Sequence, residues 1–214
     1  MNPVSSRGRP RKLPVDEQRA LVLRAARSVF AASGLAAGTI EQVARAAGVT
    51  RQAVYELYAD KARLFAAAVA DAERMAFAEV GERARDASEP RLRVWARGNY
   101  AAMFDFVAEH PDVMPLLQQA ERAGDPALTR LRERLAVVYA EASRKRWAAQ
   151  GVRSGRADRA LVTMYFAMTE ALVNMTWDGD PPDREALVDL LTEFTVGGVL
   201  RLQGQAPEVI ERLR

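Results

Sequence analysis

The chain has 214 residues, of which 49% are hydrophobic, and this is enough to bury a substantial core in one large domain or in a small and a medium one. It has no cysteine and a single histidine, His110, which excludes disulfides and thiolate nucleophiles and nearly excludes Cys/His zinc sites. A metal could be held only by carboxylates, and we expect no cofactor. Uninterrupted apolar runs are too short for a membrane span, and the polar start lacks the apolar core of a secretion signal, so we expect a cytoplasmic protein without membrane contact.

The net charge of +3 is unevenly placed along the chain. Residues 1–12 contain four basic side chains and no acidic one, so the rest of the chain has a net charge of −1. Charge concentrated at one end attracts a polyanion better than scattered charge does. A solubilising tail is an equally open interpretation from composition alone.

The first predicted element is a helix from about residues 14–16 to Ser33. Ala, Leu, Arg and Glu dominate the whole chain and period-2 runs are missing, so we predict an all-α fold. The apolar positions of this first helix repeat at helical spacing, and Gly34 comes next as a left-handed stop. Its inward stripe consists of Val22, Ala25, Ala26, Val29 and Phe30.

Two short helices are predicted next. Thr39 and Gln42 have the spacing of a capping box at the start of the first, and Gly48 ends it. Thr50 can cap the second, in the sequence RQAVYELY. Three helices therefore fit within residues 16–58.

The rest of the chain is predicted to be longer helices. Asp60 can cap a long helix from Lys61. The sequence DASEPR gives the next boundary, and turn signals at 110–115, 124–126, 150–155 and 178–183 divide the remaining residues into about five helical segments. These boundaries divide the chain into residues 1–13, 14–60, 61–87 and 88–214.

Residues 39–58 have the pattern of a helix-turn-helix. Ala44 allows close packing of the helices, Gly48 permits the turn, and Val54 holds the second helix against the first. The second helix can then present its N-terminal side chains to base edges in the major groove. A helical hairpin that binds nothing can have a similar pattern.

The sequence from residue 19 to about residue 70 resembles the DNA-binding signature of the TetR family of transcriptional regulators. The matching run is LRAARSVFAASGLAAGTIEQVARAAGVTRQAVYELYADKARLF. The resemblance implies an N-terminal three-helix helix-turn-helix DNA-binding domain (14–60) and a helical ligand-binding and dimerisation domain (88–214). Residues 1–13 are then a flexible basic arm, and residues 61–87 are a long helix that connects the two domains. The resemblance also implies a homodimer that binds palindromic operator DNA. It also implies that a small molecule shifts the long fourth helix and releases the DNA, and that the regulator is a repressor.

Two departures from the family pattern affect the expected DNA contacts. Gln52 stands where glycine or proline is common, and it can bond adenine, so we predict Gln52 and Arg51 as base readers. Leu57 cannot donate a hydrogen bond, which puts one phosphate contact of the relatives in doubt.

The resemblance implies phosphate contacts by Thr39, Tyr55 and Lys61, and we place Thr50 with them. Each also has a structural interpretation, as a cap, a core aromatic or a solvated charge. Tyr58 and Phe65 are predicted to pack in the core.

The basic arm contains Arg7-Gly8-Arg9-Pro10, which resembles the core of an AT-hook. The arginines of such an element lie in a narrow, A·T-rich minor groove. A helix-turn-helix directly after the arm favours this interpretation over a solubilising tail.

The C-terminal half suits the family's plan of a pocket and a dimer interface. The dimer candidates are Trp177, Phe194, Gly197 and Gly198, because a glycine pair inside a helix is costly unless another backbone comes close. The pocket candidates are aromatic, methionine and amide residues suited to a mostly apolar ligand: Trp95, Asn99, Met103, Phe106, Met114, Leu117, Tyr139, Met168 and Asn174. Both sets also suit an ordinary intrachain core.

An enzyme is not expected, because no nucleophile elbow, phosphate-binding glycine loop or histidine-based metal site is present. The carboxylates lie among arginines on what the pattern predicts to be solvated faces, and His110 is interpreted as a helix-end residue.

Two alternatives stay open. One is a ligand-independent DNA-binding protein whose C-terminal domain only dimerises, which a core without a cavity would favour. The other is a small-molecule-binding protein or enzyme with a vestigial helix-turn-helix, which a lack of salt-dependent DNA binding would favour.

Overall fold

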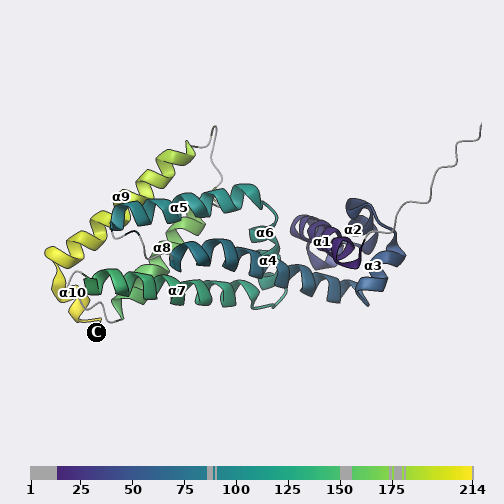
Figure 1. The fold of residues 1–214 in the computed structure, drawn as a ribbon, viewed down its shortest axis with the longest axis horizontal. Coiled ribbons are helices and arrows are strands. Elements are labelled where there is room, and N and C mark those ends of the chain that lie inside the picture. The colour runs from purple at the N-terminus through teal and green to yellow at the C-terminus, as the bar shows by residue number, and fades with distance from the viewer. Residues whose placement is uncertain are drawn as a thin grey trace, which may run out of the picture.

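The computed structural model describes residues 14–85, 89, 91–149, 156–173, 175, 180 and 182–213. Within these residues it contains ten α-helices and no strand, which confirms the predicted all-α fold. The molecule is elongated, with α1 to α3 at one end and α8 to α10 toward the other (Figure 1). The long helix α4 runs from the first group into the second.

The first three helices form a compact group. They are α1 (Val15–Ala37), α2 (Ile40–Ala47) and α3 (Arg51–Leu57). The predicted break at Gly34 is present as a kink with φ +67°, but a further turn of helix comes after it, before Gly38. At Gly38 the backbone passes close to the Phe30 ring, where an added Cβ would lie 2.7 Å from Cδ1.

Helix α1 is long and apolar enough to cross a membrane by length and composition alone, although no uninterrupted apolar run predicts this. It packs against α2, α4 and α6, and it buries Val22, Ala26 and Phe30. It also carries Arg27, which is buried and ion-paired with Asp71. The core helix of a globular protein can have the same length and composition.

Helix α4 (Lys61–Arg85) is the central element of the fold. Asp60 caps it as predicted, because its Oδ1 accepts a hydrogen bond of 2.7 Å from the Arg63 amide. Its first turns pack on α1, and its later turns pack on α5, α6 and α7. One hydrophobic core cluster extends from Val22 in α1 to Leu191 in α9.

The remaining helices surround the second half of α4. Five of them match the predicted segmentation: α5 (Leu92–Glu109), α6 (Val113–Arg122), α7 (Ala127–Ala149), α8 (Ala157–Val173) and α9 (Arg184–Gly204). The sequence did not lead us to expect α10 (Pro207–Glu211), which starts with proline at its first position, where the missing N–H costs nothing. His110 comes directly after α5, as its C-cap.

Candidate DNA-binding surface and ligand cavity

The turn between α2 and α3 is held by local hydrogen bonds. The capping box is complete: Thr39 Oγ1 accepts from the Gln42 amide at 3.2 Å, and Gln42 Oε1 accepts from the Thr39 amide at 2.8 Å. Gly48 is left-handed, with φ +67° and ψ 28°, as the pattern predicted. Val54 is fully buried, which fixes the rotation of α3 about its own axis.

The outer face of α3 carries exposed polar and aromatic side chains. Arg51, Gln52 and Tyr55 are all exposed, and Tyr55 retains 45% of its accessible surface. Thr50 caps the helix through a bond of 3.1 Å from the Ala53 amide. Arg51 forms an ion pair with Glu41 of α2, so this guanidinium is already oriented by the neighbouring helix.

The other predicted contact residues lie beside this face. Lys61 is half-buried, and its Nζ donates a hydrogen bond of 3.1 Å to the Ala36 carbonyl oxygen. Thr39 is exposed at the start of α2. Tyr58 is buried, as predicted for a core residue, and this burial raises the pKa of its phenol. Arg7 and Arg9 lie outside the described residues.

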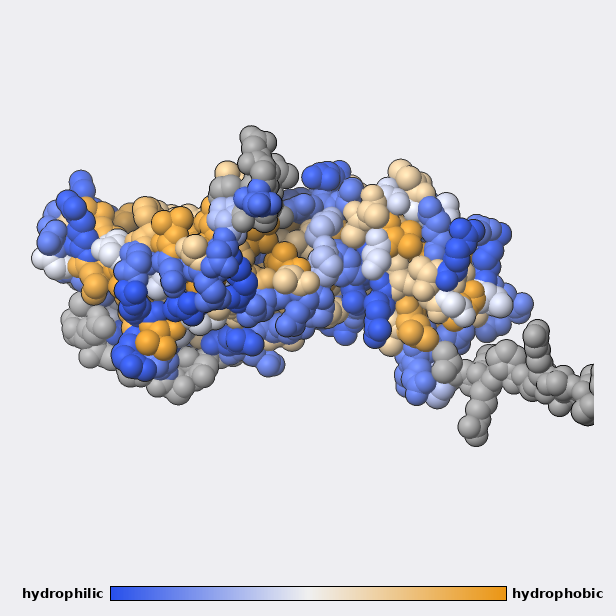
Figure 2. Space-filling model, turned by 90° about the horizontal axis from the view of Figure 1, so that it is seen from above, coloured by the Kyte–Doolittle hydropathy of each residue, from blue (hydrophilic) through white to orange (hydrophobic). Residues whose placement is uncertain are grey.

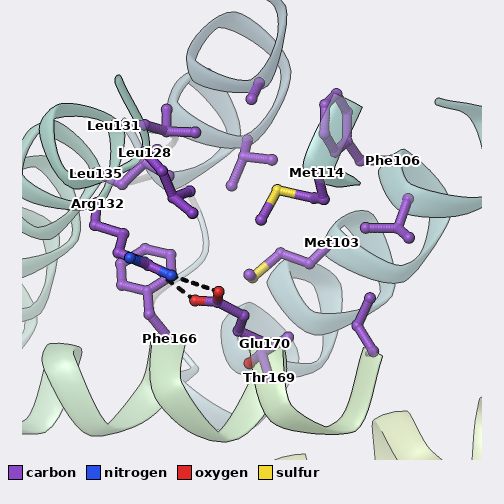
Figure 3. Close-up of a pocket in the computed structure, with 14 residues that line it drawn as sticks. Met103, Phe106, Met114, Leu128, Leu131, Arg132, Leu135, Phe166, Thr169 and Glu170 are labelled. Carbon is purple, nitrogen blue, oxygen red and sulfur yellow. Dashed lines mark hydrogen bonds and ion pairs between the residues drawn. The ribbon is translucent and has the colours of Figure 1, made fainter. Parts of the chain in front are cut away.

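A cavity of about 70 Å³ lies in the second half of the molecule, between α4, α5, α6, α7 and α8. Three of the predicted ligand residues line it: Met103, Phe106 and Met114 (Figure 3). None of the other candidates among the described residues lines it. Leu117 and Met168 are in or against the hydrophobic core, and Asn174 lies outside the described residues.

Trp95, Asn99 and Tyr139 form a hydrogen-bonded group beside the cavity, which none of them lines. Tyr139 donates to Asn99 Oδ1 at 2.9 Å, and Asn99 Nδ2 donates to the Trp95 carbonyl oxygen at 2.8 Å. The rings of Trp95 and Tyr139 lie 5.9 Å apart. The buried amide therefore has its partners inside the protein, which accounts for its place in an apolar helix face.

The structure adds two charged residues to the cavity that the sequence analysis placed on solvated faces. Arg132 Nη2 lies 2.5 Å from Glu170 Oε1, and Arg132 Nε lies 3.2 Å from Glu170 Oε2 (Figure 3). Both residues line the cavity and also stay partly exposed, with 41% of the Arg132 side chain and 27% of the Glu170 side chain accessible. A signal was present, because Glu170 is the only charged residue between Arg159 and Asp178.

An ion-pair network joins the first helix to the cavity half. Arg27 of α1 pairs with Asp71 of α4, and its Nε lies 3.4 Å from Asp112 Oδ2. Ser28 of α1 also donates to Asp112, at 3.3 Å. Asp112 directly precedes α6, whose Met114 lines the cavity. One short segment therefore touches both the cavity and helix α1 of the first helical group.

A second group of acidic side chains lies near this junction. His110 Nε2 is 3.1 Å from Glu79 Oε1, and Glu109 offers a third possible ligand atom, all within 4.8 Å of one another. A histidine thus joins carboxylates here, although the sequence led us to expect only carboxylates as ligands. We interpret the group as a hydrogen-bonded link between α4 and the end of α5.

The outer side of α8 and α9 is unusually apolar. Phe194 is 63% exposed, and Met164, Leu190 and Leu200 are exposed with it. Gly197 and Gly198 are exposed, and a Cβ added at either would meet no atom within 4 Å. Trp177 lies outside the described residues. Figure 2 shows one face of the molecule, on which apolar patches lie among charged side chains over the larger half.

Comparison with known proteins gives one family and a set of similar folds. The sequence model described as "Bacterial regulatory proteins, tetR family" matches residues 22–68. No curated protein matches the sequence. A TetR-like transcriptional regulator from a Rhodococcus species has a similar structure, with a TM-score of 0.70 and 22% identity over 88% of this chain and 99% of that one.

Two further solved structures resemble the chain over most of its length. The ketosteroid transcriptional regulator of Mycobacterium tuberculosis has a TM-score of 0.62 and 19% identity, over 85% of this chain and 94% of that one. The transcriptional regulator FadR of Bacillus subtilis, solved in complex with stearoyl-CoA, has a TM-score of 0.65 and 15% identity, over 84% and 98%. These likenesses show a shared fold.

Proposed function

We propose, from the match of residues 22–68 and from the fold, that the chain is a TetR-family transcriptional regulator that binds palindromic operator DNA as a homodimer and is released by a small, mostly apolar effector. We propose repression relieved by effector as its action, in the cytoplasm and without catalysis. Separate parts of the chain supply the DNA contacts, the dimer face and the effector site.

The observation that carries the proposal is the solvent-facing surface of α3. Arg51, Gln52 and Tyr55 are exposed on a helix that a capped turn and the buried Val54 fix in place. Such a helix fits the major groove, where Arg51 and Gln52 read base edges and Tyr55 bonds a phosphate. Thr39, Thr50 and Lys61 lie at helix N-termini, where free amides also favour a phosphate.

A response to an effector is supported by the cavity and by its connection to α1. The dimer-only alternative needs a filled core, whereas this core has a hollow beside Met114. The Arg27 and Asp112 contacts lead from α6 to α1. An effector that prefers one position of α6 can therefore change DNA affinity by as much as that preference. The relative solved with stearoyl-CoA supports an apolar effector.

Dimerisation through α8 and α9 is supported by the exposed apolar side chains there. Phe194 and Leu190 would each bury most of their surface against a second copy. Gly197 and Gly198 leave room for a close approach of the partner's backbone. A dimer places two copies of α3 in successive major grooves, about 34 to 36 Å apart.

The test is binding of the purified protein to DNA from immediately upstream of its own gene, across a salt series, beside random DNA. We expect specific binding that weakens steeply with salt. Tyr55→Phe should weaken it by about 1 kcal/mol, because one hydrogen bond is lost. Deletion of residues 1–12 should give a shallower salt slope, because Arg7 and Arg9 no longer release counterions.

The matched control is Tyr100→Phe, which removes a buried hydroxyl far from α3 and should leave the intrinsic DNA affinity unchanged. If random DNA binds as well as the upstream DNA, a genome-wide selection of bound fragments is the next step. If that selection enriches no DNA fragment, the proposal is overturned.

A further inference from the structure

An ion pair joins the two helices of the helix-turn-helix. Glu41 lies in the first turn of α2, and Arg51 is the first residue of α3. The pair forms between Glu41 Oε1 and Arg51 Nη1, with 51% of the Glu41 side chain and 55% of the Arg51 side chain accessible. A pair this exposed contributes little to folding stability, because water screens both charges. Its consequence therefore lies in the conformation of Arg51 and not in the stability of the fold.

The ion pair leaves part of the guanidinium group of Arg51 accessible to a base. A guanidinium has five N–H donors in one plane. Glu41 contacts it through Nη1, and the exposed remainder can donate two hydrogen bonds to O6 and N7 of guanine. An unrestrained arginine side chain must give up several rotamers to make these bonds, which weakens binding. Because Glu41 already restricts Arg51 in the absence of DNA, part of this entropy loss does not oppose binding.

The second predicted base reader is held in a different way. Gln52 Nε2 donates a hydrogen bond of 3.3 Å to Glu56 Oε1, four residues later in the same helix. Such a bond follows from helical spacing and needs only that α3 is folded. The contact between Glu41 and Arg51 depends instead on how α2 and α3 pack. Glu41 therefore ties the direction of the Arg51 side chain to the geometry of the whole helix-turn-helix.

Glu41 also lowers the positive charge of this surface. Residues 39–58 contain two basic and two acidic side chains, so their net charge is zero. Attraction to phosphates that ignores the base sequence grows with the number of basic groups that reach them. A neutral helix-turn-helix therefore contributes little to the binding of random DNA. The difference between operator and random DNA then depends on directed contacts such as the one from Arg51.

We propose that Glu41 is a specificity-determining residue, which positions Arg51 for guanine and lowers the affinity for random DNA. It acts on the base through Arg51 and is therefore a positioning residue. The inference rests on the proposed function, because it takes α3 as the helix that enters the major groove. Loss of the Glu41 charge has two opposite effects on affinity: it weakens the guanine contact, and it strengthens the attraction to every phosphate backbone.

The test measures the affinity of the full chain for the upstream DNA, for variants of it with one base pair changed at a time, and for random DNA. Arg51→Ala identifies the base pair that Arg51 reads. Glu41→Gln should lower the preference for guanine at that base pair by about two- to tenfold, because the arginine side chain is no longer held. Its affinity for random DNA should rise by roughly threefold, with a steeper salt slope, because one negative charge is gone.

The matched control is Glu56→Gln, which removes the same charge from an exposed position in the same motif. It should raise the affinity for random DNA in the same way and leave the preference at the Arg51 base pair unchanged. The double variant of Arg51→Ala and Glu41→Gln should have the base preference of Arg51→Ala alone, because no guanidinium remains to be positioned.

The proposal is overturned if Glu41→Gln keeps the wild-type preference for guanine, if it changes the affinity for all DNA variants equally, or if Arg51→Ala leaves every base preference unchanged. A weaker α2 helix would lower all affinities together, so the base preference separates positioning from a structural role. Any of these results with specific binding by the wild type contradicts this inference alone. If the wild type binds neither the upstream DNA nor any selected fragment specifically, the proposed function fails.

Discussion

The turn between α1 and α2 has no room for a Cβ at Gly38. Its φ of −65° is ordinary for any residue, so strain is not the reason for glycine here. The reason is space: a Cβ would lie 2.7 Å from Phe30 Cδ1 and 2.9 Å from the Gly34 carbonyl oxygen. Phe30 is fully buried and packs edge-on against Phe65 at 5.2 Å, so it cannot move freely.

We expect Gly38→Ala to lower the free energy of unfolding by about 1–3 kcal/mol, as overpacking does in a filled core. Urea unfolding followed by circular dichroism measures it. Gly98→Ala is the control, because Gly98 lies within α5 with no atom near its Cβ position. That change should stabilise by about 0.5–1 kcal/mol through helix propensity. Equal effects of the two would show that the Phe30 contact has no role.

The sequence predicts residues whose role is local and misses those whose role depends on distant helices. The Thr39 capping box and the Gly48 turn result from spacing of three residues or fewer and from one conformational preference. Glu170 lines the cavity only because α7 brings Arg132 to it across 38 positions of the chain. Its isolation among apolar residues was a signal, but a solvated charge gives the same pattern.

The helices α5, α7 and α8 meet in a cluster of tyrosines. The rings of Tyr100 and Tyr165 stack at 4.5 Å, and those of Tyr139 and Tyr165 lie 5.3 Å apart. Burial raises the pKa of all three, in the case of Tyr100 from 10.0 to about 12. A phenol that stays neutral in the folded state while the unfolded one ionises contributes stability that is complete below pH 10 and is lost as the pH rises through the folded pKa.

We therefore expect the free energy of unfolding to fall steeply between pH 10 and about 12. Tyr100→Phe should reduce this fall by up to about 3 kcal/mol, because one of the titrating groups is gone. Urea unfolding at a series of pH values measures it. Thr195→Val is the control, since it removes the hydrogen-bond partner of Tyr100 and leaves the phenol in place. If the free energy of unfolding of Tyr100→Phe falls with pH as much as that of the wild type, the fall does not come from Tyr100.

At the level of elements, helices with one polar and one apolar side were predicted well, and their ends less well. Helix α1 was predicted to stop at Gly34, but hydrogen bonding resumes beyond the kink because Phe30 and Gly38 close the turn together. Helix α10 was missed because its five residues are too few for a periodic pattern. Its Ile210 is buried beside Trp147 of α7, a contact that no local signal reveals.

If α8 and α9 form the dimer interface, operator binding by the whole molecule requires a second copy of the chain. Phe194→Glu should then give a monomer in sedimentation equilibrium, because a charge cannot be buried without a partner. Operator affinity should fall with it, since one half-site is lost. Val137→Glu is the control: Val137 is exposed on α7, outside this face. A dimeric Phe194→Glu protein would assign the interface to another surface.

The proposed coupling between the cavity and the DNA also belongs to the scale of the whole molecule. Asp112→Asn removes the charge that joins the start of α6 to Arg27. We expect it to reduce the coupling free energy between the effector probe and operator by about 0.5–2 kcal/mol. Operator affinity measured with and without octanol, as an apolar probe of the cavity, checks this expectation. Glu82→Gln, an exposed site on α4, should leave the coupling unchanged.

The burial of the Arg27 network has a consequence for ionic strength. Only 10% of the Arg27 side chain, 17% of Asp71 and 16% of Asp112 are accessible, so dissolved salt screens these charges weakly. Phosphate contacts are lost steadily as salt rises. The absolute affinity for operator should therefore change greatly between low and high salt, while the ratio of affinities without and with effector stays nearly constant. A cell whose salt content fluctuates would keep the same fold-induction from this regulator.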